Sequence, residues 1–167
     1  MEKKYLILLA VSGAIVAIDQ AVKMYIHTEF RLGESVAVLQ NIFNLTYVRN
    51  PGAAFGFLRE APEAFRSIFF LSVPPTVMLI ILAMLHTTPE SNKLQTFALS
   101  SVFGGAIGNY IDRVRFGYVV DFLDFHYHNL YTYPAFNIAD IAIVCGVGFI
   151  LFEIVKEWFD SRKKITA

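Results

Sequence analysis

The sequence predicts an all-α membrane protein with four transmembrane helices and a small extracytoplasmic β-sheet that lies on the membrane surface. Of its 167 residues, 56% are hydrophobic and only 17% are charged, and the mean hydropathy is +0.52, which is too apolar for an ordinary soluble domain. Four long apolar stretches supply the helices, and an alternating segment between the first two supplies the sheet. No break in composition divides the chain, so we expect one integral membrane domain over residues 1–167.

Each of the four apolar stretches is about twenty residues long, the length that a helix needs to cross the hydrocarbon core. The second contains Pro74 and Pro75, which we expect to kink or unwind the helix. The third carries Gly104 and Gly108, a spacing that lets another helix approach closely. The four stretches cover about residues 5–26, 65–85, 94–111 and 138–158.

The loop after the first span has the pattern of a strand. In NIFNLTYVRNPGAAFGFL, the apolar residues Phe43, Leu45 and Tyr47 alternate with polar ones, which is typical of a strand with one apolar face. The segment Asn50-Pro51-Gly52 then predicts a turn. A second strand is expected over Ala53–Leu58.

Four spans place both termini on one side of the membrane. Lysines cluster near both ends of the chain, at positions 3 and 4 and again at 163 and 164. Because cytoplasmic segments carry an excess of lysine and arginine, we expect cytoplasmic termini. The long loops, about 27–64 and 112–137, then face outward.

Polar side chains gather at the outer edge of the spans, where ionisable groups are costly and function is the default hypothesis. In the first span, Asp19 and Lys23 are four residues apart, so they share a helical face and can form an ion pair. A purely structural ion pair is as good an interpretation of them as a role in a site. The set comprises Asp19 and Lys23 in the first span, Asn109, Asp112 and Arg113 at the end of the third, and Asn137 and Asp140 at the start of the fourth.

Carboxylates are the chemistry that these residues offer. Two carboxyl groups held close together share one proton, so one can activate water while the other protonates a substrate carbonyl. This predicts peptide hydrolysis without a nucleophilic side chain and without a metal or cofactor. The formal net charge is zero, so no charge excess points to nucleic acid.

The partner of Asp140 is either Asp121 or Asp124, and spacing alone leaves both open. The sequence neighbours of Asp121 are apolar, an environment that raises the pKa of a carboxyl and favours proton sharing. Asp124 lies closer to His126 and His128 and is expected to be more exposed to water. Asp121 is therefore favoured as the partner. A small proton-coupled membrane transporter is the alternative function, although such proteins usually have internal repeats and polar groups near the midplane.

Five segments together resemble the lipoprotein signal peptidase family, also called signal peptidase II. They occur in order over nearly the whole chain: IDQAVK at 18–23, RNPGAAFGFL at 49–58, GGAIGNYIDR at 104–113, VVDF at 119–122 and PAFNIAD at 134–140. The resemblance implies a bacterial inner-membrane aspartic endopeptidase with four spans, cytoplasmic termini and an active site toward the extracytoplasmic face. It also implies a substrate class, prolipoproteins cut before a diacylglyceryl-modified cysteine, and inhibition by globomycin.

The resemblance assigns roles residue by residue. Asp121 and Asp140 match the catalytic aspartates, and Asp19 and Lys23 match the first segment. One departure is Ile141, because a serine commonly follows the final aspartate in this family. The other positions that match the family's site are Asn50, Gly52, Asn109, Arg113 and Asn137.

Overall fold

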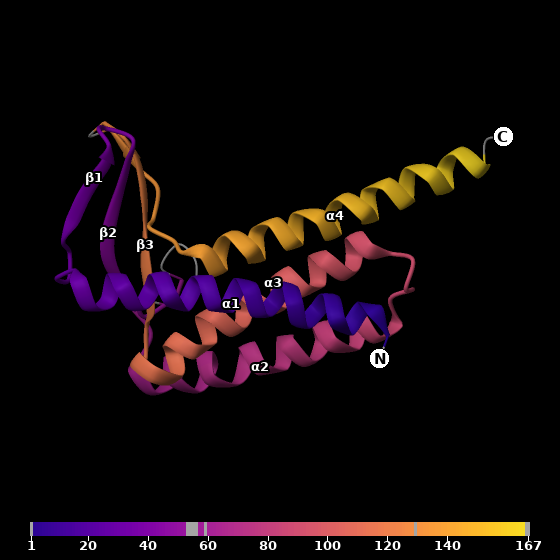
Figure 1. The fold of residues 1–167 in the computed structure, drawn as a ribbon, viewed down its shortest axis with the longest axis horizontal. Coiled ribbons are helices and arrows are strands. Elements are labelled where there is room, and N and C mark those ends of the chain that lie inside the picture. Colours follow the sequence, from indigo (N-terminus) through magenta and orange to yellow (C-terminus); the bar gives the residue numbers. More distant parts are fainter. Residues whose placement is uncertain (1, 53–56, 59, 129, 166–167) are drawn as a thin grey trace.

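The computed structural model describes residues 2–52, 57, 58, 60–128 and 130–165. In chain order, the elements are α1 (Lys3–Glu29), β1 (Ser35–Leu39), β2 (Phe43–Asn50), α2 (Glu63–Thr87), α3 (Lys93–Phe116), β3 (Val119–Tyr127), β4 (Tyr131–Thr132) and α4 (Ile138–Ile165). Figure 1 shows the helices running side by side, with the sheet standing across one end of them and both termini at the other end. The expected helices and the small sheet are therefore present.

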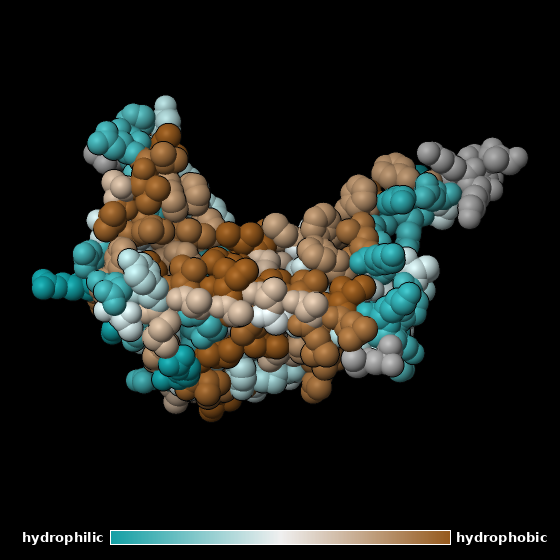
Figure 2. Space-filling model, in the orientation of Figure 1, coloured by the Kyte–Doolittle hydropathy of each residue, from teal (hydrophilic) through white to brown (hydrophobic). Residues whose placement is uncertain are grey.

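Three of the described helices, α1, α2 and α4, are long and apolar enough to cross a membrane. The helix at the position of the third expected span, α3, has 24 residues and packs against each of the other three. Its buried residues include Ser100, Ser101, Gly104 and Gly105. These small or polar residues lower the hydropathy of α3, and they are accommodated there because they face neighbouring helices instead of lipid. Figure 2 shows the hydrophobic surface along the helices lying between more hydrophilic ends.

The second helix runs through its two prolines without interruption, from Glu63 to Thr87. The expectation of unwinding at Pro74-Pro75 is therefore wrong. A proline at position 75 has no N–H to donate to the carbonyl of Leu71, four residues earlier. The hydroxyl of Tyr110 on α3 donates to that carbonyl at 3.2 Å, so a neighbouring helix satisfies the acceptor that proline leaves.

Glycines let α3 approach both α1 and α4, as the spacing predicted. A Cβ atom at Gly104 would lie 2.8 Å from the Cα of Ser12 on α1. At Gly108 it would lie 2.6 Å from Asp19 Oδ2 and 3.2 Å from the Cβ of Ala139. The axes of the three helices are therefore close enough for short polar side chains to connect them.

The sheet is antiparallel, with strand order β1-β2-β3-β4. The strand predicted through Phe43, Leu45 and Tyr47 is confirmed as β2, which runs on to Asn50, and its register opposes Val48 to Asp121. Its described partners are β1 and β3. The sequence predicts a second strand at 53–58; residues 53–56 lie outside the described residues, and Phe57 and Leu58 are in a turn.

The ladder of β2 ends at Asn50 because the chain turns away there. Pro51 has no N–H to donate to a neighbouring strand, and the N–H of Gly52 donates to Asn50 Oδ1 at 3.0 Å. Below the sheet, Ile26 of α1 packs with Tyr47, Val120 and Phe122. This cluster fixes β3 against the C-terminal end of α1.

Replacing Gly104 with alanine tests the close approach of α3 to α1. The added methyl would meet backbone of α1, which cannot rotate away, so Gly104→Ala should lower the free energy of unfolding by about 1–3 kcal/mol. Gly13→Ala is the matched control, because a Cβ on Gly13 of α1 meets nothing within 4 Å. Thermal unfolding in detergent measures both, and equal melting temperatures for the two variants would contradict the packing.

Candidate active site

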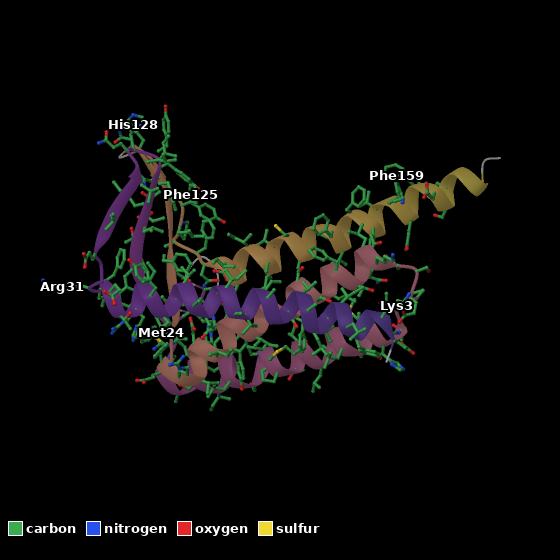
Figure 3. All side chains as sticks on the ribbon, viewed as in Figure 1. Lys3, Met24, Arg31, Phe125, His128 and Phe159 are labelled. Atoms are coloured by element: carbon green, nitrogen blue, oxygen red, sulfur yellow. The ribbon has the colours of Figure 1, made fainter. Side chains whose placement is uncertain are left out.

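Polar side chains from three helices and the sheet meet where the sheet joins the bundle. Asp121 lies on β3 and is 2% exposed, and Asp140 lies in the first turn of α4. Asn109 comes from the C-terminal half of α3. Figure 3 places Phe125, four residues after Asp121, on the side of the sheet that faces α4. The structure therefore brings these segments, distant in sequence, to one place.

One residue, Asn137, holds both candidate catalytic carboxyls. Its side-chain Nδ2 donates to Asp121 Oδ1 at 2.7 Å, and its backbone N–H donates to Asp140 Oδ2 at 3.1 Å. Each carboxyl has a second amide donor: Asn50 Nδ2 binds Asp121 Oδ2 at 3.0 Å, and Asn109 Nδ2 binds Asp140 Oδ1 at 2.8 Å. Four hydrogen bonds thus fix the orientation of the pair.

The start of α4 explains why Asn137 and Asp140 are three residues apart. Asn137 Oδ1 accepts from the backbone N–H of Asp140 at 2.9 Å, and Asp140 Oδ2 accepts in return from the backbone N–H of Asn137. This reciprocal pattern is a capping box, which satisfies N–H groups that a helix start leaves without partners. The same bonds that begin the helix therefore position the carboxylate, at a helix end that attracts negative charge.

A buried ionic network supports the pair from α1. Lys23 Nζ lies 2.9 Å from Asp19 Oδ2 and 3.1 Å from Asp112 Oδ2. Asp19 Oδ1 accepts from the N–H of Ala139 at 2.9 Å, and Asp112 Oδ2 accepts from the N–H of Val120 at 3.0 Å. The expected Asp19–Lys23 ion pair is confirmed, and the network ties α1 to α3, to the first turn of α4 and to the start of β3.

Sequence reasoning missed Gln20 as a member of this network. Its Nε2 donates to Asp112 Oδ1 at 2.9 Å and to the carbonyl of Gly108 at 3.1 Å. An uncharged amide within an apolar span, next to Asp19, was the available signal.

Arg113 connects α3 to the turn after β2. Its Nη2 donates to the carbonyl of Gly52 at 3.1 Å, and its Nη1 donates to the carbonyl of Asn109 at 3.2 Å. The guanidinium lies 4.6 Å from the ring centre of Phe70 on α2, in a cation–π contact. Arg113 therefore links Gly52 to Asn109, whose side chain binds Asp140.

A groove of about 1280 Å³ reaches both Asp121 and Asp140. Its lining residues come from α2, α3 and α4 and from the strands of the sheet. The carboxyls lie at the polar end, and the rest is mainly apolar, with residues such as Val73, Val77, Val102 and Val144. A long apolar ligand with a peptide bond near one end fits this arrangement.

Two further residues of α4 line the groove. One is Cys145, which is exposed. It faces outward because the buried side of α4 at this level is Gly146, which lies against Ala98 and Val102 of α3. Ile141 also lines the groove, so its departure from the family pattern places a branched apolar side chain beside Asp140.

The two aspartates of β3 have different partners. Asp124 also lines the groove, but it accepts a hydrogen bond from Thr46 Oγ1 at 2.8 Å. Asp121 is the one bound by Asn137, which also binds Asp140. The geometry therefore favours Asp121 as the partner of Asp140.

The surroundings of Asp121 raise the pKa of its carboxyl to about 7. Burial is the largest cause, because it penalises the charged form, and the negative charge of Asp140 adds to it. Hydrogen bonds from Asn50 and Asn137 and the charge of Lys23 act in the opposite direction. Near neutral pH, this carboxyl therefore exchanges a proton readily.

Comparisons with known proteins agree over most of the chain. Residues 11–156 match the family model of signal peptidase II. The chain is 44% identical over 157 residues to a lipoprotein signal peptidase of Syntrophus aciditrophicus, covering 94% of this chain and 97% of the relative. It is 46% identical over 146 residues to that of Desulforapulum autotrophicum, covering 87% and 89%.

A solved structure of a bacterial membrane enzyme has the same fold. It superposes with a TM-score of 0.81 at 33% sequence identity, covering 90% of this chain and 88% of that one. On the family model, the curated relatives and this structure, the chain belongs to the signal peptidase II family, the lipoprotein signal peptidases.

Proposed function

We propose that this chain is a membrane-embedded aspartic endopeptidase that removes signal peptides from prolipoproteins, cutting just before the diacylglyceryl-modified cysteine. The observation that carries the proposal is Asn137, which donates hydrogen bonds to Asp121 and Asp140 at the polar end of an apolar groove. The names of the relatives support the substrate class. The aspartic type is supported by the paired carboxyls.

In the proposed reaction, Asp121 is protonated and Asp140 is ionised. Asp140 takes a proton from a water molecule, whose oxygen attacks the scissile carbonyl carbon, while Asp121 gives its proton to the carbonyl oxygen. The tetrahedral intermediate then returns that proton to Asp121, the C–N bond breaks, and Asp140 gives its proton to the leaving amine. Both carboxyls end in their starting states, and no cofactor takes part.

The proposal includes a position in the membrane. We place four spans in the bacterial inner membrane, counting α3, because it is surrounded by the three more apolar helices. Lys3 and Phe159 lie at the end opposite to Phe125 and His128 (Figure 3), and lysine-rich ends suit the cytoplasm. The site then opens toward the extracytoplasmic face, within one peptidase domain over residues 1–167.

The sheet suits the outer membrane surface. Tyr127, Leu130 and Tyr131, near its tip, are 61%, 83% and 63% exposed, and exposed tyrosines are typical of the boundary between lipid and water. A sheet in this position would hold the substrate at the level of the carboxyls. Globomycin-type inhibitors are expected to bind the same groove.

Removing either carboxyl should abolish cleavage. Asp121→Asn and Asp140→Asn each take away one proton-transfer group, so kcat should fall roughly 10²–10⁴-fold while the protein still inserts and folds. The measurement is turnover of a lipidated prolipoprotein peptide in lipid, with the unlipidated peptide as substrate control. Near-normal turnover by either folded variant would rule out the pair.

The neighbouring aspartate is the matched control. Asp124→Asn makes the same chemical change three residues along β3, where the carboxyl contacts Thr46 and not Asn137. This variant should keep most of its activity in the same assay. If it were inactive and folded while Asp121→Asn remained active, the partner of Asp140 would have to be reassigned.

The rate should fall as pH rises through about 7, because the mechanism needs Asp121 protonated and its pKa is raised to about 7. Asn50→Ala removes a hydrogen bond that lowers this pKa, so the alkaline limb of kcat/KM should move to higher pH. Initial rates across a pH series measure both effects. A limb that moves to lower pH in Asn50→Ala would contradict the assignment of Asp121 as the proton donor.

A further inference from the structure

The ammonium group of Lys23 uses all of its donors inside the protein. An ammonium carries three N–H donors and no acceptor. Two are directed at Asp19 and Asp112, and the third donates to Asn109 Oδ1 at 2.8 Å. The lysine side chain is 2% exposed, so it does not reach the groove or a substrate. It can act on the reaction through its charge and through its hydrogen bond to Asn109.

Asn109 stands between a group that only donates and a group that only accepts. Lys23 requires the amide oxygen to face it, which leaves the amide NH₂ to face the other way. That NH₂ donates to Asp140 Oδ1 at 2.8 Å, and an ionised carboxylate only accepts. The orientation of this amide is therefore set by the ammonium.

A second amide is oriented in the same way by backbone. Asn137 Oδ1 accepts from the N–H of Asp140, so its NH₂ faces Asp121 Oδ1 at 2.7 Å and Asn109 Oδ1 at 3.1 Å. Together, the two amides present only donors to the carboxyl pair, as does Asn50. A proton on either carboxyl then finds an acceptor in the other carboxyl or in whatever enters the groove.

We propose that Lys23 is a positioning residue that, by holding the oxygen of Asn109, turns donors toward the carboxyl pair and so directs the shared proton into the groove toward the substrate. This inference rests on the proposed function and adds a role beyond a structural ion pair. A structural pair with Asp19 and Asp112 would stabilise the fold, and its charge would still act on Asp121, but it would not orient the amide of Asn109.

The charged groups around the pair define what a change at Lys23 does. They are Lys23 and Asp19 from α1, Asp112 and Arg113 from α3, and Arg49 and Asp124 from the sheet. The positive charge of Lys23 lowers the pKa of Asp121. Losing that charge therefore moves the proton affinity of Asp121 upward, which a kinetic pH profile detects.

The first test compares two buried lysines of α1. Lys23→Met should lower kcat about tenfold to hundredfold, which is the effect that losing an orienting hydrogen-bond partner has at metal sites. KM should change less than about twofold, and the alkaline limb should move to higher pH. Lys4→Met is the matched control: Lys4 donates to the carbonyls of His86 and Thr88 at 2.7 and 3.1 Å, far from the carboxyls. It should lower the melting temperature and leave kcat and the limb unchanged.

A folded Lys23→Met with the wild-type kcat and pH profile would overturn the inference, as would a change confined to KM. Because this variant leaves two buried carboxylates without their partner, a second variant covers the case in which it does not fold. Asn109→Asp keeps the shape of the side chain and can still pair with Lys23, but the oxygen facing Asp140 then lacks a hydrogen unless it is protonated.

Asn109→Asp should therefore cleave only at acidic pH, where its carboxyl carries the proton that the NH₂ normally supplies. A wild-type pH profile in this variant would show that the donor facing Asp140 is not needed, and the inference would be wrong. Wild-type protein in the same assay separates a failure of the proposed function from a failure of the role of Lys23. If wild type fails to cleave the lipidated peptide, the proposed function fails; if it cleaves and the variants match it, only the role of Lys23 fails.

Discussion

Two acidic side chains held side by side repel each other once both are ionised, and this constraint shapes the site. Asn137 binds Asp121 and Asp140 at once, so the pair cannot separate to relieve the repulsion. Taking up one proton is the remaining way to relieve it. Burial of Asp121 and, second to it, this repulsion raise its pKa to about 7, which leaves one carboxyl able to donate and the other able to accept near neutral pH. Hydrolysis by an activated water needs this combination.

The rest of the bundle keeps that arrangement in place. Buried charges are costly unless they are paired and hydrogen-bonded, and Lys23 meets this requirement through Asp19, Asp112 and Asn109. These contacts join α1 and α3, and their short distances depend on the close helix packing that Gly108 allows. The hydrogen bond from Ala139 to Asp19 then fixes the first turn of α4, where Asp140 lies. Packing, ionic network and helix start thus form one continuous support for the carboxyls.

The sequence predicted what depends on local pattern. Most helices extend a few residues beyond the expected spans. The strand through Phe43, Leu45 and Tyr47 and the close glycine contact between helices are confirmed. Contacts between distant residues could not be predicted, because spacing says nothing about them: Lys23 and Asn109 are 86 positions apart. The edge strand β1 is exposed along its whole length. It therefore has no alternation of buried and exposed residues that an apolar–polar pattern in the sequence could indicate. The expected unwinding at the prolines of α2 does not occur. Tyr110, on another helix, satisfies the carbonyl of Leu71 that proline leaves without a donor.

The central claim is that Asp121 carries a proton near neutral pH because its carboxyl is buried and Asp140 is held beside it. Infrared difference spectroscopy of the protein in lipid measures this directly, since a protonated carboxyl has a carbonyl band distinct from that of a carboxylate. Subtracting the pH titration of Asp121→Asn from that of wild type isolates the band of Asp121. The account predicts a band that is present at acidic pH and disappears as pH rises through about 7. A difference spectrum in which Asp121 is already fully ionised well below that pH would contradict it.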